Sequence, residues 1–143
     1  LETFWAKVVI IFAITWRWSG YNMIFYLSSM QNIDRGVYEA AEIDGAGAWQ
    51  KFWYITVPLL KPVILLTAIM STTGTLQLFD EVVNITSGGP ANSTMSISQY
   101  IYNLSFKYAP DFGYAATVSY AIFIMVAVLS LIQMKVSGDR NDN

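Results

Sequence analysis

Three long runs of apolar residues, separated by shorter polar stretches, organise the chain. The clearest runs from Phe112 to Met134 without a charged residue, and a second runs from Pro62 to Phe79. A third, from Phe4 to Ile33, is interrupted only by Lys7 and Arg17. A helix needs about 20 apolar residues to cross the hydrocarbon core of a bilayer. The pattern therefore predicts an all-α membrane protein with three transmembrane helices, over about residues 4–30, 58–80 and 112–134.

Composition favours the same class of protein. Hydrophobic residues make up 55% of the 143 residues and charged residues 13%, with a mean hydropathy of +0.42. Because an average soluble domain is about 25% charged, a soluble core of three buried helices is the alternative that composition argues against. The chain has no cysteine, no histidine and a formal net charge of −2, which predicts no metal site, no enzyme activity and no nucleic-acid partner.

Basic residues predict how the helices are oriented. Loops rich in lysine and arginine stay on the cytoplasmic side of a membrane. We therefore expect the loop over residues 31–57 and the carboxy terminus to be cytoplasmic, and the loop over residues 81–111 to lie outside. Since Leu1 is not an initiating methionine, we expect residues 1–143 to be the carboxy-terminal part of a longer protein. The basic residues assigned to the cytoplasmic side are Arg35, Lys51, Lys61, Lys135 and Arg140.

The cytoplasmic loop has the pattern of two short helices joined by a turn. Strong helix formers precede Gly45 and Gly47, and a second helical stretch runs from Ala48 to Ile55. Glycine at such a point supplies a turn or a helix end. The small side chains of Ala40 and Ala41 would let the backbone of another protein come close, although a connecting hairpin without a partner fits the same pattern.

The same loop resembles the EAA signature of permease subunits of binding-protein-dependent ABC importers. The matching residues are Glu39, Ala40, Ala41, Gly45, Ile55 and Pro58, and the sequence departs at Val57, where leucine is usual. Asp44, Tyr21-Asn22 and the outer stretch Thr86 to Pro90 resemble the carbohydrate-uptake branch, of the maltose, lactose and glycerol-phosphate type. Permeases of this branch usually have at least six helices, so the chain resembles the last three.

The resemblance implies partners and a coupling role for the loop. In that family the EAA helix is the coupling helix, seated in a groove of a cytoplasmic ATPase subunit that binds ATP and magnesium. It implies that the EAA residues, together with Asp44, couple to the ATPase: Glu39 would make a polar contact, Ala40 and Ala41 would permit close approach, and Gly45 would form the turn. It also implies a second permease, two ATPase copies, an extracytoplasmic solute-binding protein and the lipid of a bacterial inner membrane. Ser87 to Pro90 lacks the lysine and the spacing of a phosphate-binding loop, so ATP chemistry is expected in a partner.

Two polar stretches within the apolar runs are candidates for a substrate path. Arg17 is an intramembrane charge, which marks a functional site by default, and Trp18 and Tyr21 share its helical face, with Asn22 adjacent. Aromatic faces and hydrogen-bonding groups suit a sugar. The alternative is that the tryptophans form an interfacial belt and that Arg17 reaches the lipid headgroups.

The second stretch lies at the far end of the second predicted span. Hydroxyls and a glycine can line a cavity, or they can form a tight contact between helices. The face in question carries Ser71, Gly74, Thr75 and Leu78. In the outer loop, apolar positions from Ile97 to Tyr108 recur at helical spacing, which predicts a short amphipathic helix capped by Thr94, lying near a docked binding protein or closing the bundle.

The sequence thus predicts the permease subunit of an ATP-driven sugar importer. One alternative is an importer of the same type for another solute, such as a glycerol phosphate, a polyamine or an amino acid. The other is a membrane scaffold subunit that moves nothing.

Overall fold

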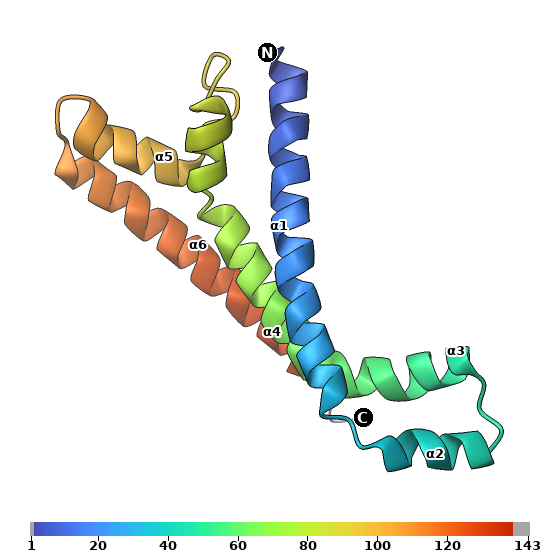
Figure 1. The fold of residues 1–143 in the computed structure, drawn as a ribbon. Helices are drawn as coiled ribbons and strands as arrows, with labels where there is room; N and C mark the ends of the chain where they lie inside the picture. The colour runs from blue at the N-terminus through green and yellow to red at the C-terminus, as the bar shows by residue number, and fades with distance from the viewer. Residues whose placement is uncertain (1, 139–143) are drawn as a thin grey trace. The chain divides into compact units, whose positions relative to one another are not determined.

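The structure, a computed structural model, describes residues 2–138, and these form helices with short connections and no strand (Figure 1). Three helices are long and apolar enough to cross a membrane: Thr3–Gln31, Ala48–Leu76 and Phe112–Val136. The predicted all-α membrane fold with three spanning helices is confirmed. Arg140, which was assigned to the cytoplasmic side, lies outside the described residues. The elements in chain order are α1 (Thr3–Gln31), α2 (Arg35–Ile43), α3 (Ala48–Lys51), η1 (Phe52–Thr56), α4 (Val57–Leu76), η2 (Val82–Thr86), α5 (Ile97–Tyr102), η3 (Asn103–Lys107) and α6 (Phe112–Gly138), where η marks a π-helical turn.

The long helices are apolar on nearly all sides. Large side chains such as Phe12, Trp16 and Phe123 stand exposed on α1 and α6. A helix that is hydrophobic all round is either buried in a large core or surrounded by lipid. Since these faces are not covered within the described chain, they fit lipid or the apolar helices of further protein.

The second spanning helix differs from the sequence prediction at both ends. The helical stretch from Ala48 to Ile55 was expected to be a separate short helix, but α3, η1 and α4 form one helix from Ala48 to Leu76. Pro58 does not start a new helix there. It is separated only by Val57 from the π-helical turn Phe52–Thr56, and such a local adjustment can accommodate the missing proline N–H group. At the other end α4 stops at Leu76 rather than at residue 80, after a run of β-branched residues and glycine with low helix propensity.

Residues 19–68 form one compact unit, which contains the second half of α1, the short helices α2 and α3, and the first part of α4. The hydroxyl groups of Tyr26 on α1 and Thr67 on α4 lie 2.8 Å apart in a hydrogen bond. Thr67 is 1% exposed and also donates to the Val63 carbonyl of its own helix. A buried hydroxyl that is satisfied on both sides fixes the two helices against each other.

Residues 2–18 and 69–138 form the other unit. Its small apolar core joins Ile10 of α1 to Leu78 and Val82, with Ile14 packed against them. The Gln133 amide of α6 donates to the Thr72 hydroxyl of α4 over 2.9 Å. The short helix α5 lies alongside α6 (Figure 1), and the rings of Tyr100 and Tyr114 and those of Phe106 and Phe112 meet edge to face.

Helix α5 differs from its prediction in its cap and in its buried face. Ser96, not Thr94, caps α5, because its hydroxyl accepts from the Gln99 N–H group at 3.2 Å. The Thr94 hydroxyl instead donates to the Gly89 carbonyl at 2.8 Å, inside the preceding loop. The polar side of the helix faces inward, where Gln99 and Asn103 are each 4% exposed. Helix α5 is therefore amphipathic with its polar face inside.

Candidate functional site

The loop that carries the EAA pattern folds as a helical hairpin, α2–turn–α3. Asp34 caps the start of α2 by accepting the Gly36 N–H group at 2.9 Å. At the other end Gly45 adopts a φ of +81°, which glycine reaches without the strain of a side chain. The Ala46 N–H group donates to Ala41 and the Gly45 N–H group to Glu42, at 2.9 and 3.0 Å, in the Schellman arrangement. The predicted glycine turn is thus present, with its geometry fixed by two backbone bonds.

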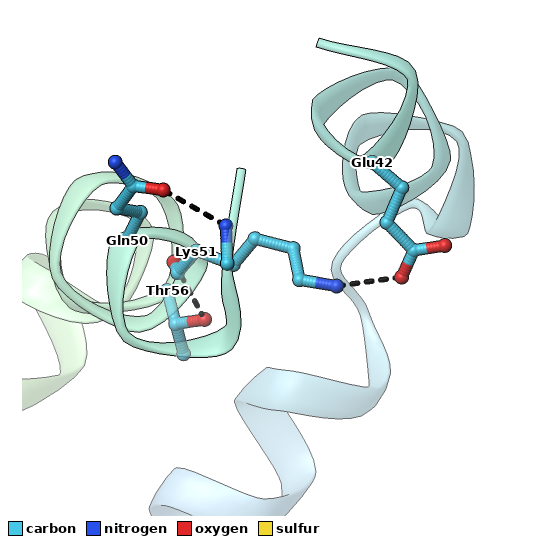
Figure 2. Close-up of polar contacts among 5 residues, drawn as sticks. Glu42, Gln50, Lys51 and Thr56 are labelled. Carbon is cyan, nitrogen blue, oxygen red and sulfur yellow. Dashed lines mark hydrogen bonds and ion pairs between the residues drawn. The ribbon is translucent and has the colours of Figure 1, made fainter. Parts of the chain in front are cut away.

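Side chains tie the two arms of the hairpin together. The Lys51 ammonium donates to the Glu42 carboxylate at 2.5 Å, and Gln50 accepts the Gly47 N–H group at 2.8 Å, as Figure 2 shows. The Tyr38 and Thr56 hydroxyl groups form a hydrogen bond of 2.8 Å, and Thr56 is 4% exposed. Helix α2 is therefore held to the helix that follows the turn near both of its ends.

The EAA residues lie on the accessible surface of this hairpin. Glu39, Ala40, Asp44 and Gly45 are exposed and Ala41 is half-buried. Large apolar side chains are exposed beside them: Ile43 is 87% exposed, Trp49 76% and Tyr54 80%. Large apolar side chains that are exposed on one element suit contact with a protein or a membrane. A hollow of about 260 Å³ at the apex is lined by Asp44, Gly45, Ala46, Gln50, Lys51, Tyr54 and Ile55.

The ion pair of the hairpin predicts a pH dependence. Hydrogen bonding and charge attraction from Lys51 hold the pKa of Glu42 below its ordinary value of 4.5. Because the folded pKa is depressed, the ion pair contributes its stabilisation above pH 4.5 and loses it as the pH falls through the folded value. We expect the Glu42 carboxyl band in infrared difference spectra, identified by subtracting a Glu42→Gln variant, to titrate at a lower pH in the wild type than in a Lys51→Met variant. Equal midpoints in both proteins would contradict the pairing.

The charged residue within the first span has a partner that the sequence analysis missed. The Arg17 guanidinium on α1 pairs with the carboxylate of Glu81, which directly precedes η2. The side chains are 47% and 12% exposed, so the arginine reaches its partner from a half-open position while the carboxylate is largely sheltered. The second oxygen of Glu81 is buried and has no hydrogen-bond partner among the described residues. An intramembrane arginine is itself the signal to look for a carboxylate partner.

The neighbouring Trp18 of α1 lies tightly against Gly74 of α4. A Cβ atom at Gly74 would lie 2.3 Å from a ring carbon of Trp18, a separation that carbon atoms do not reach without one of them moving. The Arg17 guanidinium carbon also lies 5.3 Å from the centre of the Trp18 ring, within cation–π range. Gly74 therefore makes a tight helix contact, one of the two roles that the sequence left open.

The remaining predicted path residues are distributed over both units. Tyr21 and Asn22 belong to residues 19–68, where the Tyr21 ring packs on Phe25 with a centroid distance of 5.1 Å. Ser71 is half-buried on α4, and Thr75 lines a hollow of about 410 Å³ together with Lys7 and Ser93. Leu78 lies beyond the end of α4 and is 8% exposed in the apolar core, so it does not continue the face of Ser71, Gly74 and Thr75.

The glycine-rich loop over residues 86–94 is held by its own hydrogen bonds. The hydroxyl groups of Thr86 and Thr94 lie 2.8 Å apart, and Gly88 has a φ of +85°. A Cβ atom at Gly88 would lie 2.7 Å from the Gln99 side-chain oxygen, so the glycine gives room to the buried amide beneath it. The Thr86–Pro90 stretch thus has a local structural reason for its glycines.

This architecture defines an apolar, all-helical membrane component with an exposed helical hairpin. The chain belongs to the family of binding-protein-dependent transport system inner membrane components, whose pattern matches residues 2–137. The expected relationship to carbohydrate-uptake permeases is confirmed by its relatives.

Three relatives show how far that similarity extends. The chain is 64% identical over 141 residues to the lactose transport system permease protein LacF of Rhizobium radiobacter, which is 97% of this chain and 47% of LacF. It is 37% identical to the multiple sugar-binding transport system permease protein MsmF of Streptococcus mutans, over 92% of this chain and 45% of MsmF. It is 35% identical to the arabinooligosaccharides transport system permease protein AraP of Bacillus subtilis, over 91% of this chain and 42% of AraP. The chain spans about half the length of these relatives.

Proposed function

We propose that the chain is part of the permease subunit of an ATP-driven importer that moves a sugar across a bacterial inner membrane. The observation that carries this proposal is the 64% identity to a permease named for lactose transport, over 97% of the chain. The pairing of Arg17 with Glu81 supports a neutral solute, because the positive charge that would attract an anion is already balanced. An importer of glycerol phosphate or another anion is therefore the less favoured alternative.

The hairpin is proposed as the coupling element. Its exposed Glu39, Ala40 and Asp44, with exposed apolar side chains beside them, suit a groove on a cytoplasmic ATPase, which would bind ATP and magnesium. Two ATPase copies, a second permease and an extracytoplasmic solute-binding protein complete the proposed assembly. Movement of the hairpin would then shift the membrane helices between inward- and outward-facing states, since a partner that binds one state better shifts the equilibrium.

The proposed function implies an orientation of the chain in the membrane and a set of residues along the sugar path. Loop charge supports a cytoplasmic hairpin and a cytoplasmic carboxy terminus, with α5 outside. Residues with aromatic or hydroxyl groups on α1 and α4 are proposed to border the sugar path, whereas Gly74 and Leu78 are assigned to packing. The proposed path residues are Arg17, Trp18, Tyr21, Asn22, Ser71 and Thr75.

Uptake by intact cells tests the proposal. Cells that express the full-length permease with its neighbouring importer genes are given labelled lactose, maltose, an arabinooligosaccharide and glycerol 3-phosphate, and cells lacking the permease gene are the control. We expect permease-dependent uptake of at least one of the neutral sugars and none of glycerol 3-phosphate. Uptake of glycerol 3-phosphate alone would overturn the assignment to sugars, and no permease-dependent uptake would favour the scaffold alternative.

A further inference from the structure

The two contacts that hold α2 to the following helix differ in their surroundings. The pair of Glu42 and Lys51 lies near the apex, with Glu42 63% exposed, and exposed ion pairs contribute little to stability. The contact between Tyr38 and Thr56 lies near the start of α2 and is sheltered, since Thr56 is 4% exposed. A hydrogen bond in such a low-dielectric position is stronger and costs more to leave unmade. The Tyr38–Thr56 bond is therefore the firmer attachment.

Thr56 occupies a special place in its own helix. It is the last residue of the π-helical turn η1, and its hydroxyl also lies 3.4 Å from the Lys51 carbonyl, as the close-up in Figure 2 shows. The helix that contains it runs without a break from Ala48 to Leu76. A displacement of α2 would therefore act on the long helix at Thr56 as well as at Lys51, and every residue from Ala48 to Leu76 is helical. Single π-helical turns inside α-helices are frequent at functional sites.

We infer that Tyr38 and Thr56 are positioning residues, which act through their shared hydrogen bond to pass movement of α2 to the long helix α3–η1–α4. This inference rests on the proposed coupling of the hairpin to an ATPase. Neither residue needs to touch the ATPase or the sugar. Tyr38 lies in α2, the helix that also carries Glu39, Ala40 and Ala41. Its partner Thr56 lies immediately before the first residue of α4.

The first measurement tests the attachment itself and needs no transport. Amide hydrogen exchange of the full-length protein in nanodiscs is compared for the wild type, Tyr38→Phe, Thr56→Val and Thr56→Ser. We expect exchange over residues 36–46 to speed up by about two- to tenfold in Tyr38→Phe and Thr56→Val, the equilibrium factor of one neutral hydrogen bond, and to stay near the wild-type rate in Thr56→Ser. Exchange over α6 is the internal reference. Unchanged exchange in both variants would overturn the inference.

The second measurement tests whether the bond passes on motion. Because the chain has no native cysteine, a Leu59→Cys substitution provides one spin-label site in it, at a half-exposed position on α4. The assembled importer is given ATP with vanadate, and the change in spin-label mobility is recorded. We expect Tyr38→Phe and Thr56→Val to reduce this change by about two- to tenfold while ATP hydrolysis continues, and the double variant to be no worse than either single.

A matched control separates this role from a general loss of structure. Tyr108→Phe removes a phenol hydroxyl from an exposed outer residue and should leave the nucleotide response at the wild-type size. Additive losses in the double variant, or a full response in both single variants, would overturn the inference. A wild-type importer with no nucleotide response would instead contradict the proposed coupling, and the exchange measurement would still decide whether the bond holds the hairpin.

Discussion

Replacement of Gly45 by aspartate is expected to abolish sugar uptake while the permease remains in the membrane. A Cβ atom at this position meets nothing within 4 Å, so the hairpin has room for the side chain. The backbone strain at a φ of +81° costs about 1 kcal/mol, and aspartate is among the residues that tolerate it. At the proposed ATPase contact, however, the new carboxylate would be buried without a partner, at a cost of about 3–5 kcal/mol. The initial rate of uptake of the transported sugar should fall by more than about a hundredfold.

Asparagine at the same position is the matched control. It has nearly the same shape as aspartate and tolerates the left-handed conformation equally well, but it carries no charge. We expect Gly45→Asn to keep most of the uptake, with membrane levels of both variants measured by immunoblot. Equal loss in the two variants would assign the effect to the turn rather than to the contact, and full uptake in Gly45→Asp would favour a scaffold protein whose hairpin has no partner.

Removal of Arg17 is expected to destabilise the protein more than removal of its partner. Arg17→Met would leave the carboxylate of Glu81, which is 12% exposed, without its counter-charge. Breaking a buried pair in this way costs about 3–5 kcal/mol, and we expect roughly 2 kcal/mol because the arginine side is half-open. Glu81→Met leaves an arginine that can reach headgroups or water, so its cost is smaller. Thermal unfolding of the full-length protein in detergent measures the order of the two effects.

The double variant Arg17→Met with Glu81→Met separates a structural role from a transport role. With both charges gone, stability should return to near the wild-type value. Sugar uptake that returns with stability would assign the pair to structure alone. A stable double variant without uptake would place Arg17 or Glu81 on the sugar path. A double variant no more stable than Arg17→Met would contradict the pairing.

The sequence predicted those features that depend on local pattern. The three spans follow from apolar runs long enough to cross a bilayer, and the turn at Gly45 follows from a residue type that its backbone angle requires. The start of the second span was predicted wrongly at residue 58, because proline is often found in the first turn of a helix. In the structure Pro58 lies inside the helix Ala48–Leu76, after a π-helical turn. Helical spacing also placed Leu78 on the same face as Ser71, Gly74 and Thr75. In the structure α4 ends at Leu76, before Leu78 is reached.

Pairings between distant residues could not be predicted from the sequence, for a physical reason. Nothing in the residues around Glu81 specifies that Arg17 lies within reach, and the same holds for Tyr38 and Thr56, since both contacts depend on how whole helices pack. The inward polar face of α5 was not predicted, for a different reason. Helical spacing identifies a stripe of apolar residues but does not decide which side faces the core when lipid, rather than water, surrounds the protein.

The π-helical turn before α4 has a consequence for insertions and deletions. Each residue of an α-helix turns the chain by roughly 100°, whereas i to i+5 bonding holds one residue more within a turn. The five residues Phe52–Thr56 thus set the rotational phase between the hairpin and the buried positions Leu60 and Thr67. Loss of one residue from this turn would carry the Thr67 hydroxyl away from Tyr26. Length changes between Ala48 and Thr67 should therefore not be tolerated.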